Sequence, residues 1–556
     1  MEYTADQLPD GEELSAQVVI VGAGPAGIVS ALELADHGID VLLIESGRWK
    51  PSPELEGRFE PELKGPTSYD VLENLSRRQV GGTSVIWGGR CVPYDPVDFD
   101  HRPHIEHADW PISYGEVSSF HERACEYLHC GTPVFDALAL PELGGRLLSP
   151  GLVNDEVRTS DLERWSLPTN FGKEYAKRLK RHRRLRLVTA LTCVEVVSEP
   201  STTAVAHLRC VTRNGREITV RGDEYVIAAG GLETTRLLLN SNRLHPGGIG
   251  NHSDHLGRWY MSHMDGRIAR IEFSSDPRET IVAHERDANG IYVRRRLSIS
   301  REAQHRHQLP NIVAWPANPN LVDAAHGNGT LSFTYLALTS RLGHRLASEA
   351  LRQRLEQSDP SPARDHLRNI VSSPLDTASF ILFFGYRRFL PWRRAPGFLV
   401  RTANNRYPLH YHGEHLPSRD SRITLTRDRD DAGMRRALVD LRFSDKDVDG
   451  VLRAHDLWDS YLKRHGGGRL IFDDGDPGEA VNRQLKGGRH QIGTTRMSND
   501  PQNGVLTPEL TVHGLENLSV VAASAFCSSS QANPTFLLVC LALRRADALR
   551  RRFSRS

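Results

Sequence analysis

The sequence has almost no imbalance of charge, since its 70 lysines and arginines face 69 acidic residues over 556 positions. A net charge of +1 gives no reason to expect nucleic-acid binding or long-range attraction of acidic partners. Apolar residues make up 39% and charged residues 25%, as in ordinary globular proteins. At ordinary domain sizes the length allows about two to four domains.

Cysteine is also scarce. The seven cysteines are few for this length, their number is odd, and no CxxC pair occurs. Cys125 and Cys130 have no cluster of cysteine or histidine around them at zinc-ligand spacing. We therefore expect neither a disulfide framework nor a structural zinc site. The same cysteine usage fits a protein of a reducing compartment.

Long apolar runs are missing too. The first six residues are acidic and polar, unlike a signal peptide. The run Ala378–Tyr386 is far too short to cross a bilayer, and two arginines close it. We expect a soluble, cytoplasmic protein without a membrane span.

The N-terminal region carries a nucleotide-binding pattern. Gln17–Val21 is a β-branched run typical of a buried parallel strand, and Ile28–His37 has helical spacing. The turn between them has the form GxGxxG, in which Gly22 permits the tight turn, Gly24 lets a pyrophosphate approach the backbone, and Gly27 lets helix and strand pack closely.

A second strand, Val41–Ile44, follows the helix and leads into Glu45. This acid is placed to accept hydrogen bonds from an adenosine ribose. The βαβ unit therefore indicates a dinucleotide site. The GxGxxG pattern and Glu45 together do not show whether the dinucleotide is NAD or FAD.

Further strands are predicted on both sides of residue 265. Before it, we expect a meander of three strands, Leu185–Val197, Ala204–Thr212 and Glu217–Val220. A buried strand, Tyr225–Ala229, follows and leads into a helix that ends near Asn240. After residue 265 we expect the strands Arg267–Phe273, Gly290–Leu297, Thr330–Leu338 and Arg422–Thr426, with helical spacing over Ala347–Ser372. The different pattern of strands and helices after residue 265 predicts a second domain, residues 266–469. It would be inserted between the two parts of the first domain, residues 1–265 and 470–556.

Two polar residues near the C-terminus suggest proton chemistry. His490 opens the segment His490–Met497, and Asn533 precedes Pro534 and Thr535. A neutral imidazole has a pKa of about 6.5, which suits the removal of an alcohol proton near neutral pH. An asparagine beside it could steady the developing alkoxide.

Four further segments resemble the glucose–methanol–choline (GMC) oxidoreductase family. They follow the family's order along the chain: Gly81–Arg90, Ala228–Leu238, Leu256–His263, and Gly514–Val521 leading into Asn533. The resemblance covers nearly the whole sequence and is nearest to the pyranose-oxidase-like branch, whose catalytic pair is His/Asn. It implies an α/β fold, with a Rossmann-like FAD-binding domain and an inserted substrate domain of antiparallel sheet and helices.

On this resemblance, FAD is the cofactor and His490 and Asn533 form the catalytic pair. The base takes the hydroxyl proton while the flavin accepts the hydride. The implied FAD contacts are Gly22, Gly24, Pro25, Ala26, Gly27, Glu45, Ser46, Gly81, Gly82, Thr83, Ile86, Trp87, Gly88, Leu191, Ala229, Gly230, Glu233, Ala522, Asn533, Pro534 and Thr535. Ile86 stands where pyranose oxidase has the histidine bonded to flavin, so we expect non-covalent FAD.

The predicted strand Leu409–Leu416 contains three histidines and one glutamate. Alternation would send His410, His412 and Glu414 to one face. A metal site is one interpretation, but the family counterpart lies by the substrate cavity and carries no metal. We therefore expect His412 or Glu414 to contact substrate, no metal ion, and a structural role for His263.

The resulting prediction is an FAD-dependent oxidation of a hydroxyl on a polar, sugar-like molecule, with an amino sugar or aminoglycoside as a special case. The electron acceptor could be oxygen, a quinone or another compound, and the oligomeric state is open. Two alternatives are a non-redox flavin-containing lyase of the same family and a non-catalytic flavin-binding protein.

Overall fold

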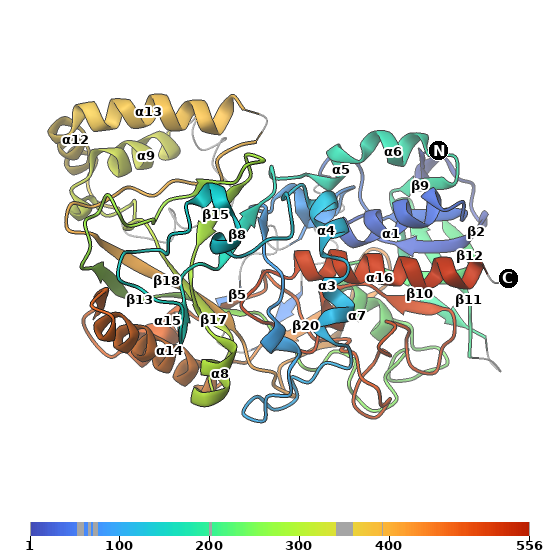
Figure 1. Cartoon of the computed structure of the whole chain (residues 1–556). Coiled ribbons are helices and arrows are strands. Elements are labelled where there is room, and N and C mark those ends of the chain that lie inside the picture. Colours follow the sequence, from blue (N-terminus) through green and yellow to red (C-terminus); the bar gives the residue numbers. More distant parts are fainter. Residues whose placement is uncertain are drawn as a thin grey trace.

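The computed structural model describes residues 2–52, 61–64, 68–69, 76–199, 203–340, 360–391 and 393–554. It has a mixed α/β fold built around two large sheets (Figure 1). In the described part of the chain, no helix combines the length and apolar character needed to span a bilayer.

The first sheet has eight strands drawn from both ends of the chain. Their order is β1 (Glu2–Thr4), β9 (Leu185–Thr189), β3 (Val41–Glu45), β2 (Glu13–Val21), β12 (Glu217–Ile227), β11 (Val205–Thr212) and β10 (Leu191–Ser198), with β23 (Leu518–Val520) also paired to β12. Pairing is parallel from β1 through β12 and to β23, and antiparallel at β11 and β10. Strand β3 is buried along its whole length, as a parallel strand covered on both faces should be.

Helices α1 (Pro25–Asp36) and α16 (Thr535–Phe553) pack together against this sheet (Figure 1). The close approach of α1 depends on glycine. A Cβ on Gly27 would lie 1.9 Å from the carbonyl oxygen of Gly22, and Gly22 itself has a φ of 102°. A side chain at Gly27 would push the helix off the strand, and one at Gly22 would strain the turn and lie 2.6 Å from the carbonyl oxygen of Ala228.

The second sheet is antiparallel and has six strands: β21 (Gly468–Phe472), β13 (His263–Phe273), β18 (Arg406–Glu414), β17 (Ile312–Pro316), β16 (Leu297–Ile299) and β7 (Val157–Arg158). A smaller antiparallel sheet contains β14 (Glu285–Arg286), β15 (Tyr292–Arg295), β8 (Leu162–Trp165) and β6 (Arg90–Cys91). Two further sheets combine β19 (Arg422–Arg429), β20 (Arg435–Asp440) and β4 (Glu62–Leu63), and β22 (Lys486–Gly487) with β5 (Ser68–Tyr69).

Longer helices border the two sheets. They are α4 (His121–Leu128), α7 (Gly231–Asn240), α8 (Arg301–His307), α9 (Gly329–Thr339), α12 (Ala363–Ser372), α13 (Pro374–Phe389), α14 (Asp445–Arg464) and α15 (Pro477–Gln484). Short helices are α3 (Tyr114–Ser118), α5 (Phe171–Glu174) and α6 (Ala176–Arg181). Helices α9, α12 and α13 form a group at one outer corner of the molecule, away from both termini (Figure 1).

The predicted α/β fold, a Rossmann-like unit with an antiparallel sheet beside it, is confirmed. The predicted limits of the inserted domain remain a prediction. Two strands of the six-stranded sheet run past those limits, because β13 begins at His263 and β21 ends at Phe472, and β7 joins from residues 157–158.

Several predicted elements were wrong. Thr330–Leu338 is helical, because the Asn328 side chain caps α9 by accepting from the N–H of Leu331 and the helix packs on α12 and α13. Leu185–Val197 is two strands, divided at Ala190 with a φ of 57°, and β9 joins the parallel part of the sheet rather than a meander. The two strands predicted between residues 217 and 229 are one, β12. Of the predicted helix Ala347–Ser372, residues 363–372 are helical and residues 347–359 lie outside the described residues.

Candidate active site

The turn between β2 and α1 faces a long cavity of about 430 Å³. Pro25 is the first residue of α1, where its fixed φ and missing N–H cost nothing. The first turn of the helix therefore offers free backbone N–H groups and the positive end of the helix dipole. This is the arrangement that binds a pyrophosphate.

Glu45 lies beside this turn and lines the same cavity. Its carboxylate accepts hydrogen bonds from the N–H groups of Ala23 and Gly47, each at 2.8 Å. Burial raises the pKa of Glu45, while these hydrogen bonds and the nearby charge of Arg78 oppose the rise. The carboxylate is thus held in place at the cavity wall, where a ribose would need an acceptor.

Nearly all of the predicted FAD contacts line this one cavity. The exceptions are Gly27 and Gly81, which lie behind it: Gly27 packs on Gly22, and the N–H of Gly81 donates to the carbonyl of Ala23 at 2.8 Å. Residues from five distant segments meet here, and the glycine cradle and the acid fit a dinucleotide such as FAD. Ile86 lines the cavity as well; non-covalent attachment remains a prediction.

One cation in this cavity, Arg78, is not predicted by any sequence motif. Arg78 lies in a coil before the glycine-rich loop, and its guanidinium pairs with Glu233 at 3.2 Å. Burial lowers the pKa of Arg78, and the Glu233 charge opposes that change. Arg78 and Glu45 thus bring opposite charges to the same end of the cavity.

His490 and Asn533 meet at the other end. Asn533 Nδ2 lies 3.2 Å from His490 Nε2, and both residues line the cavity. Arg90, from β6, donates to Asn533 Oδ1 at 2.7 Å, and Glu163 holds the same guanidinium through two hydrogen bonds of 3.0 and 2.6 Å. Because arginine only donates, Arg90 fixes the amide with its NH₂ group toward His490.

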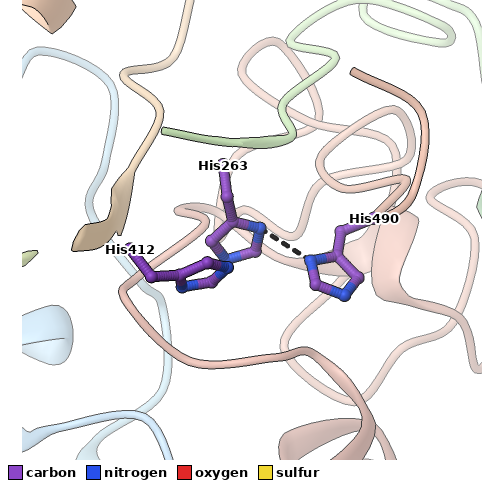
Figure 2. Close-up of side chains that lie close together, drawn as sticks. All are labelled: His263, His412 and His490. Atoms are coloured by element: carbon purple, nitrogen blue, oxygen red, sulfur yellow. Dashed lines mark hydrogen bonds between the residues drawn. The ribbon is translucent and has the colours of Figure 1, made fainter. Parts of the chain in front are cut away.

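His263 completes a chain of hydrogen bonds behind His490 (Figure 2). Its Nε2 lies 3.1 Å from the carbonyl oxygens of Ser529 and Ala532, which only accept, so the proton of a neutral His263 sits on Nε2. Its Nδ1 is then an acceptor and lies 2.8 Å from His490 Nδ1, which must donate. His490 consequently presents an unprotonated Nε2 to Asn533 and the cavity.

His412, from β18, packs on the other side of His263. The two rings stack with centroids 4.4 Å apart, and His412 Nδ1 lies 2.7 Å from the carbonyl oxygen of Gln531. The three histidines are close enough to hold a metal ion. Hydrogen bonds account for their arrangement, however, because backbone carbonyls and the His263–His490 pair engage four of the six ring nitrogens.

Burial keeps these imidazoles neutral. It lowers the pKa of His490 to about 3, and the charges of His412, Arg489 and Arg90 act in the same direction while Asp265 opposes them. Burial likewise lowers the pKa of His412 to about 4 and that of His263 well below its usual value. A neutral His490 is the form that can accept a proton.

Arg489 and Arg496 flank His490 closely in sequence, and both are expected from the sequence to face outward or to pair with acids. Arg489 is exposed at the cavity. The expectation for Arg496 was wrong. Arg496 is buried, its guanidinium lies 4.9 Å from the centre of the Trp259 ring, and it donates to the carbonyl of His107.

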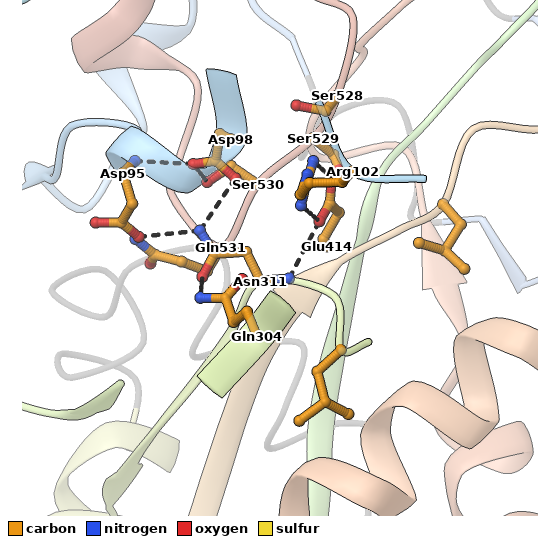
Figure 3. Close-up of polar contacts among 12 residues, drawn as sticks. Asp95, Asp98, Arg102, Gln304, Asn311, Glu414, Ser528, Ser529, Ser530 and Gln531 are labelled. Atoms are coloured by element: carbon orange, nitrogen blue, oxygen red, sulfur yellow. Dashed lines mark hydrogen bonds and ion pairs between the residues drawn. The ribbon is translucent and has the colours of Figure 1, made fainter. Parts of the chain in front are cut away.

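Glu414 does not face this cavity. Arg102 holds its two carboxylate oxygens at 2.7 and 2.8 Å, both side chains are fully buried, and the N–H of Asn311 also donates to it (Figure 3). A substrate ammonium group would have to displace this arginine. We therefore do not retain Glu414 as a substrate contact.

Glu414 instead belongs to a buried polar network that holds the loop 528–532 before Asn533 (Figure 3). In it Ser530 Oγ donates to Asp98 at 2.7 Å, and Gln531 Nε2 donates to Asp95 at 2.8 Å. Burial raises the pKa of Asp98 to about 7, with Arg102 opposing the change. The loop therefore carries carbonyls 529 and 532 to His263 on a rigid support.

The fold and this cavity define an FAD-binding oxidoreductase. A family model described as GMC oxidoreductase matches residues 417–542, and one described as FAD binding domain matches residues 15–53. Among solved structures, pyridoxine 4-oxidase from Mesorbium loti aligns over 96% of this chain and 99% of its own, with a TM-score of 0.55 and 17% identity. Formate oxidase from Aspergillus oryzae RIB40 aligns over 98% and 100%, with a TM-score of 0.52 and 16% identity.

Similar sequences have related descriptions. The chain is 23% identical to 2-methyl-1,2-propanediol dehydrogenase of Mycolicibacterium austroafricanum over 97% of this chain and 95% of that protein. It is 26% identical to paromamine 6'-oxidase of Streptomyces fradiae over 43% and 52%, and 25% identical to 6'''-hydroxyparomomycin C oxidase of Streptomyces lividus over 46% and 54%. These matches support the GMC oxidoreductase family, and the chain is an FAD-dependent alcohol oxidoreductase.

We predict that His263 fixes the tautomer of His490. His263→Phe keeps a ring but removes the acceptor for His490 Nδ1, so His490 can adopt the tautomer that carries its proton on Nε2. We expect kcat to fall by up to the roughly 10²- to 10⁴-fold that a positioned base supplies, with FAD content retained and Tm lowered, because the carbonyls of Ser529 and Ala532 lose this donor.

His263→Gln supplies an amide oxygen as acceptor and should restore part of that loss. His455→Phe is the matched control, because His455 is also a buried neutral histidine but bonds the carbonyl of Val451 in its own helix. Equal kcat losses for His263→Phe and His263→Gln would contradict a positioning role.

Proposed function

We propose that the protein oxidises a hydroxyl group of a polar, sugar-like molecule, with His490 as the base that takes the hydroxyl proton. The observation that carries the proposal is the unprotonated Nε2 of His490, held between Asn533 and His263 at the cavity. FAD, when bound, supplies the acceptor for the hydride from the carbinol carbon. The products are then a carbonyl compound and a proton on His490, and an external acceptor takes the two electrons.

Asn533 assists this step. Its amide NH₂ points toward His490 Nε2, where the substrate oxygen must come to give up its proton. A fixed donor at that point stabilises negative charge as it develops on the oxygen. Arg90 and Glu163 prevent the amide from rotating, so the donor is in place before substrate arrives.

One acid of the second sheet supports an ammonium group on the substrate. Asp265 is the cross-strand partner of His412, so the two side chains project from the same face of the sheet. The Asp265 side chain is 38% exposed, and its Oδ1 lies 2.5 Å from His410 Nε2. Its charge also acts on His490, which indicates that it lies near the base.

Among the described acids near the base, Glu163 is held by arginines, and Asp95, Asp98 and Glu414 belong to the buried network. Glu163 is fully buried between Arg90 and Arg294, whose guanidiniums also lie 5.1 and 4.2 Å from the centre of the Trp315 ring. We propose Asp265, which is part-exposed and already pairs with His410, as the carboxylate that also contacts a substrate amine. The names of the two paromamine-type oxidases fit an amino sugar as the substrate.

The base is tested with His490→Ala. We expect kcat to fall by about 10²- to 10⁴-fold with FAD content unchanged, since the imidazole contributes proton transfer rather than cofactor binding. Anaerobic mixing with an amino-sugar alcohol should bleach the oxidised flavin of the wild type and leave the variant yellow on the same timescale. Full activity of the variant would show that His490 is not the base.

The pH dependence follows from the low pKa of His490, about 3. A depressed pKa means that the imidazole stays unprotonated as the pH falls through 6.5. For a neutral alcohol, kcat/KM should therefore have no limb near 6.5 and stay level down to about pH 5. An acid limb centred near 6.5 would show that the base titrates like a solvated histidine.

Asp265→Asn tests the proposed amine contact. It should raise KM for a cationic amino alcohol by roughly 10- to 100-fold, equivalent to the about 1.5–3 kcal/mol of a charge-assisted hydrogen bond. A neutral polyol should be oxidised as by the wild type. Asp473→Asn is the control, because Asp473 is an exposed acid paired with Arg270 on the same sheet. Equal KM changes for both substrates would exclude amine recognition by Asp265.

A further inference from the structure

Exposed apolar side chains gather on one part of the surface. Of the twelve large apolar side chains exposed in the described part of the chain, eight lie between Leu367 and Leu390, on or beside α12 and α13. Soluble surfaces rarely concentrate such residues, and an apolar patch of this kind marks an interaction site.

The residues on α13 form a stripe. They are Leu375, Leu382, Phe383 and Tyr386, together with Leu390, the αR residue that directly follows the helix. Their offsets of 7, 8, 11 and 15 from the first place them on one side of a helix. Their exposed fractions run from 61% to 84%. We call these five residues the α13 stripe.

The opposite side of α13 is already packed. Phe380 and Phe384 contact Phe398 with ring centroids 4.6 and 5.0 Å apart, and Thr377 is buried. The helix therefore has one apolar side for the protein interior and a second that faces outward. The α12–α13 pair also lies at an outer corner of the molecule (Figure 1), so a flat surface could approach it.

Positive charge accompanies the stripe. Residues 360–394 contain six arginines and two aspartates, a net charge of 6 − 2 = +4, whereas the whole chain has only +1. Arg387 and Arg394 are exposed near the C-terminal end of α13. A helix with apolar side chains on one face and arginines beside them matches the interface of an anionic bilayer.

We propose that the α13 stripe and its arginines rest in the headgroup region of an anionic phospholipid bilayer and hold the enzyme at a membrane surface. Charge favours this partner over a second copy of the chain, because two such faces in contact would bring +4 against +4. The proposal does not depend on the identity of the substrate.

Cosedimentation of the full-length, FAD-loaded enzyme with lipid vesicles tests the proposal. We expect binding to vesicles of phosphatidylglycerol and phosphatidylcholine that weakens with added salt, and little binding to phosphatidylcholine alone. Leu382→Glu/Phe383→Glu and Arg387→Glu/Arg394→Glu should each weaken binding by roughly tenfold or more, with alcohol oxidation in solution unchanged.

Leu138→Glu/Leu244→Glu is the control pair, because both leucines are about half exposed but belong to segments other than α12 and α13. Absence of vesicle binding by the wild type would overturn the proposal, as would binding unaffected by both test pairs. A dimer in sedimentation velocity that Leu382→Glu/Phe383→Glu abolishes, without vesicle binding, would assign the stripe to a second copy instead.

Discussion

The active site depends on a hydrogen-bond chain that can run in only one direction. It starts at Arg90, which only donates, passes through Asn533, His490 and His263, and ends at backbone carbonyls, which only accept. Every proton between these ends is therefore assigned when the rings are neutral. The lone pair of His490 points toward Asn533 because no other arrangement satisfies both ends.

Keeping this chain neutral and fixed places demands on its surroundings. Buried histidines lose solvation when charged, which is why their pKa values are low. The terminal carbonyls must also stay in place, although Ser530 in their loop has a φ of 58°, a left-handed conformation costing about 1–3 kcal/mol. The buried contacts of this loop with Asp95 and Asp98 offset that cost, so the network that contains Glu414 supports the histidine chain indirectly.

Most residues predicted for the nucleotide end do line one cavity, and for a physical reason. The turn at Gly22 and the acid Glu45 work through local geometry, in which a strand, a turn and a helix follow one another directly. The other end is assembled from residues near positions 90, 263, 490 and 533, and no periodicity links them. His263 was therefore expected to be structural, and Arg90 was seen only as the last residue of a glycine-rich loop.

The wrong predictions for Glu414 and for Thr330–Leu338 share one cause. The periodicity of a sequence shows which side chains lie on one face of a strand or helix, but it does not show which part of the fold packs against that face. Alternation correctly grouped Glu414 with His412, yet only the fold brings Arg102 against that carboxylate. Thr330–Leu338 has strand-like residues, yet α12 and α13 provide a helical packing surface. The same reasoning applies to α13, where apolar residues on two sides predict a buried helix. Among the described residues, the side with Phe380 and Phe384 is covered while the other apolar side is exposed, which is why we assign that second side to a partner outside the fold.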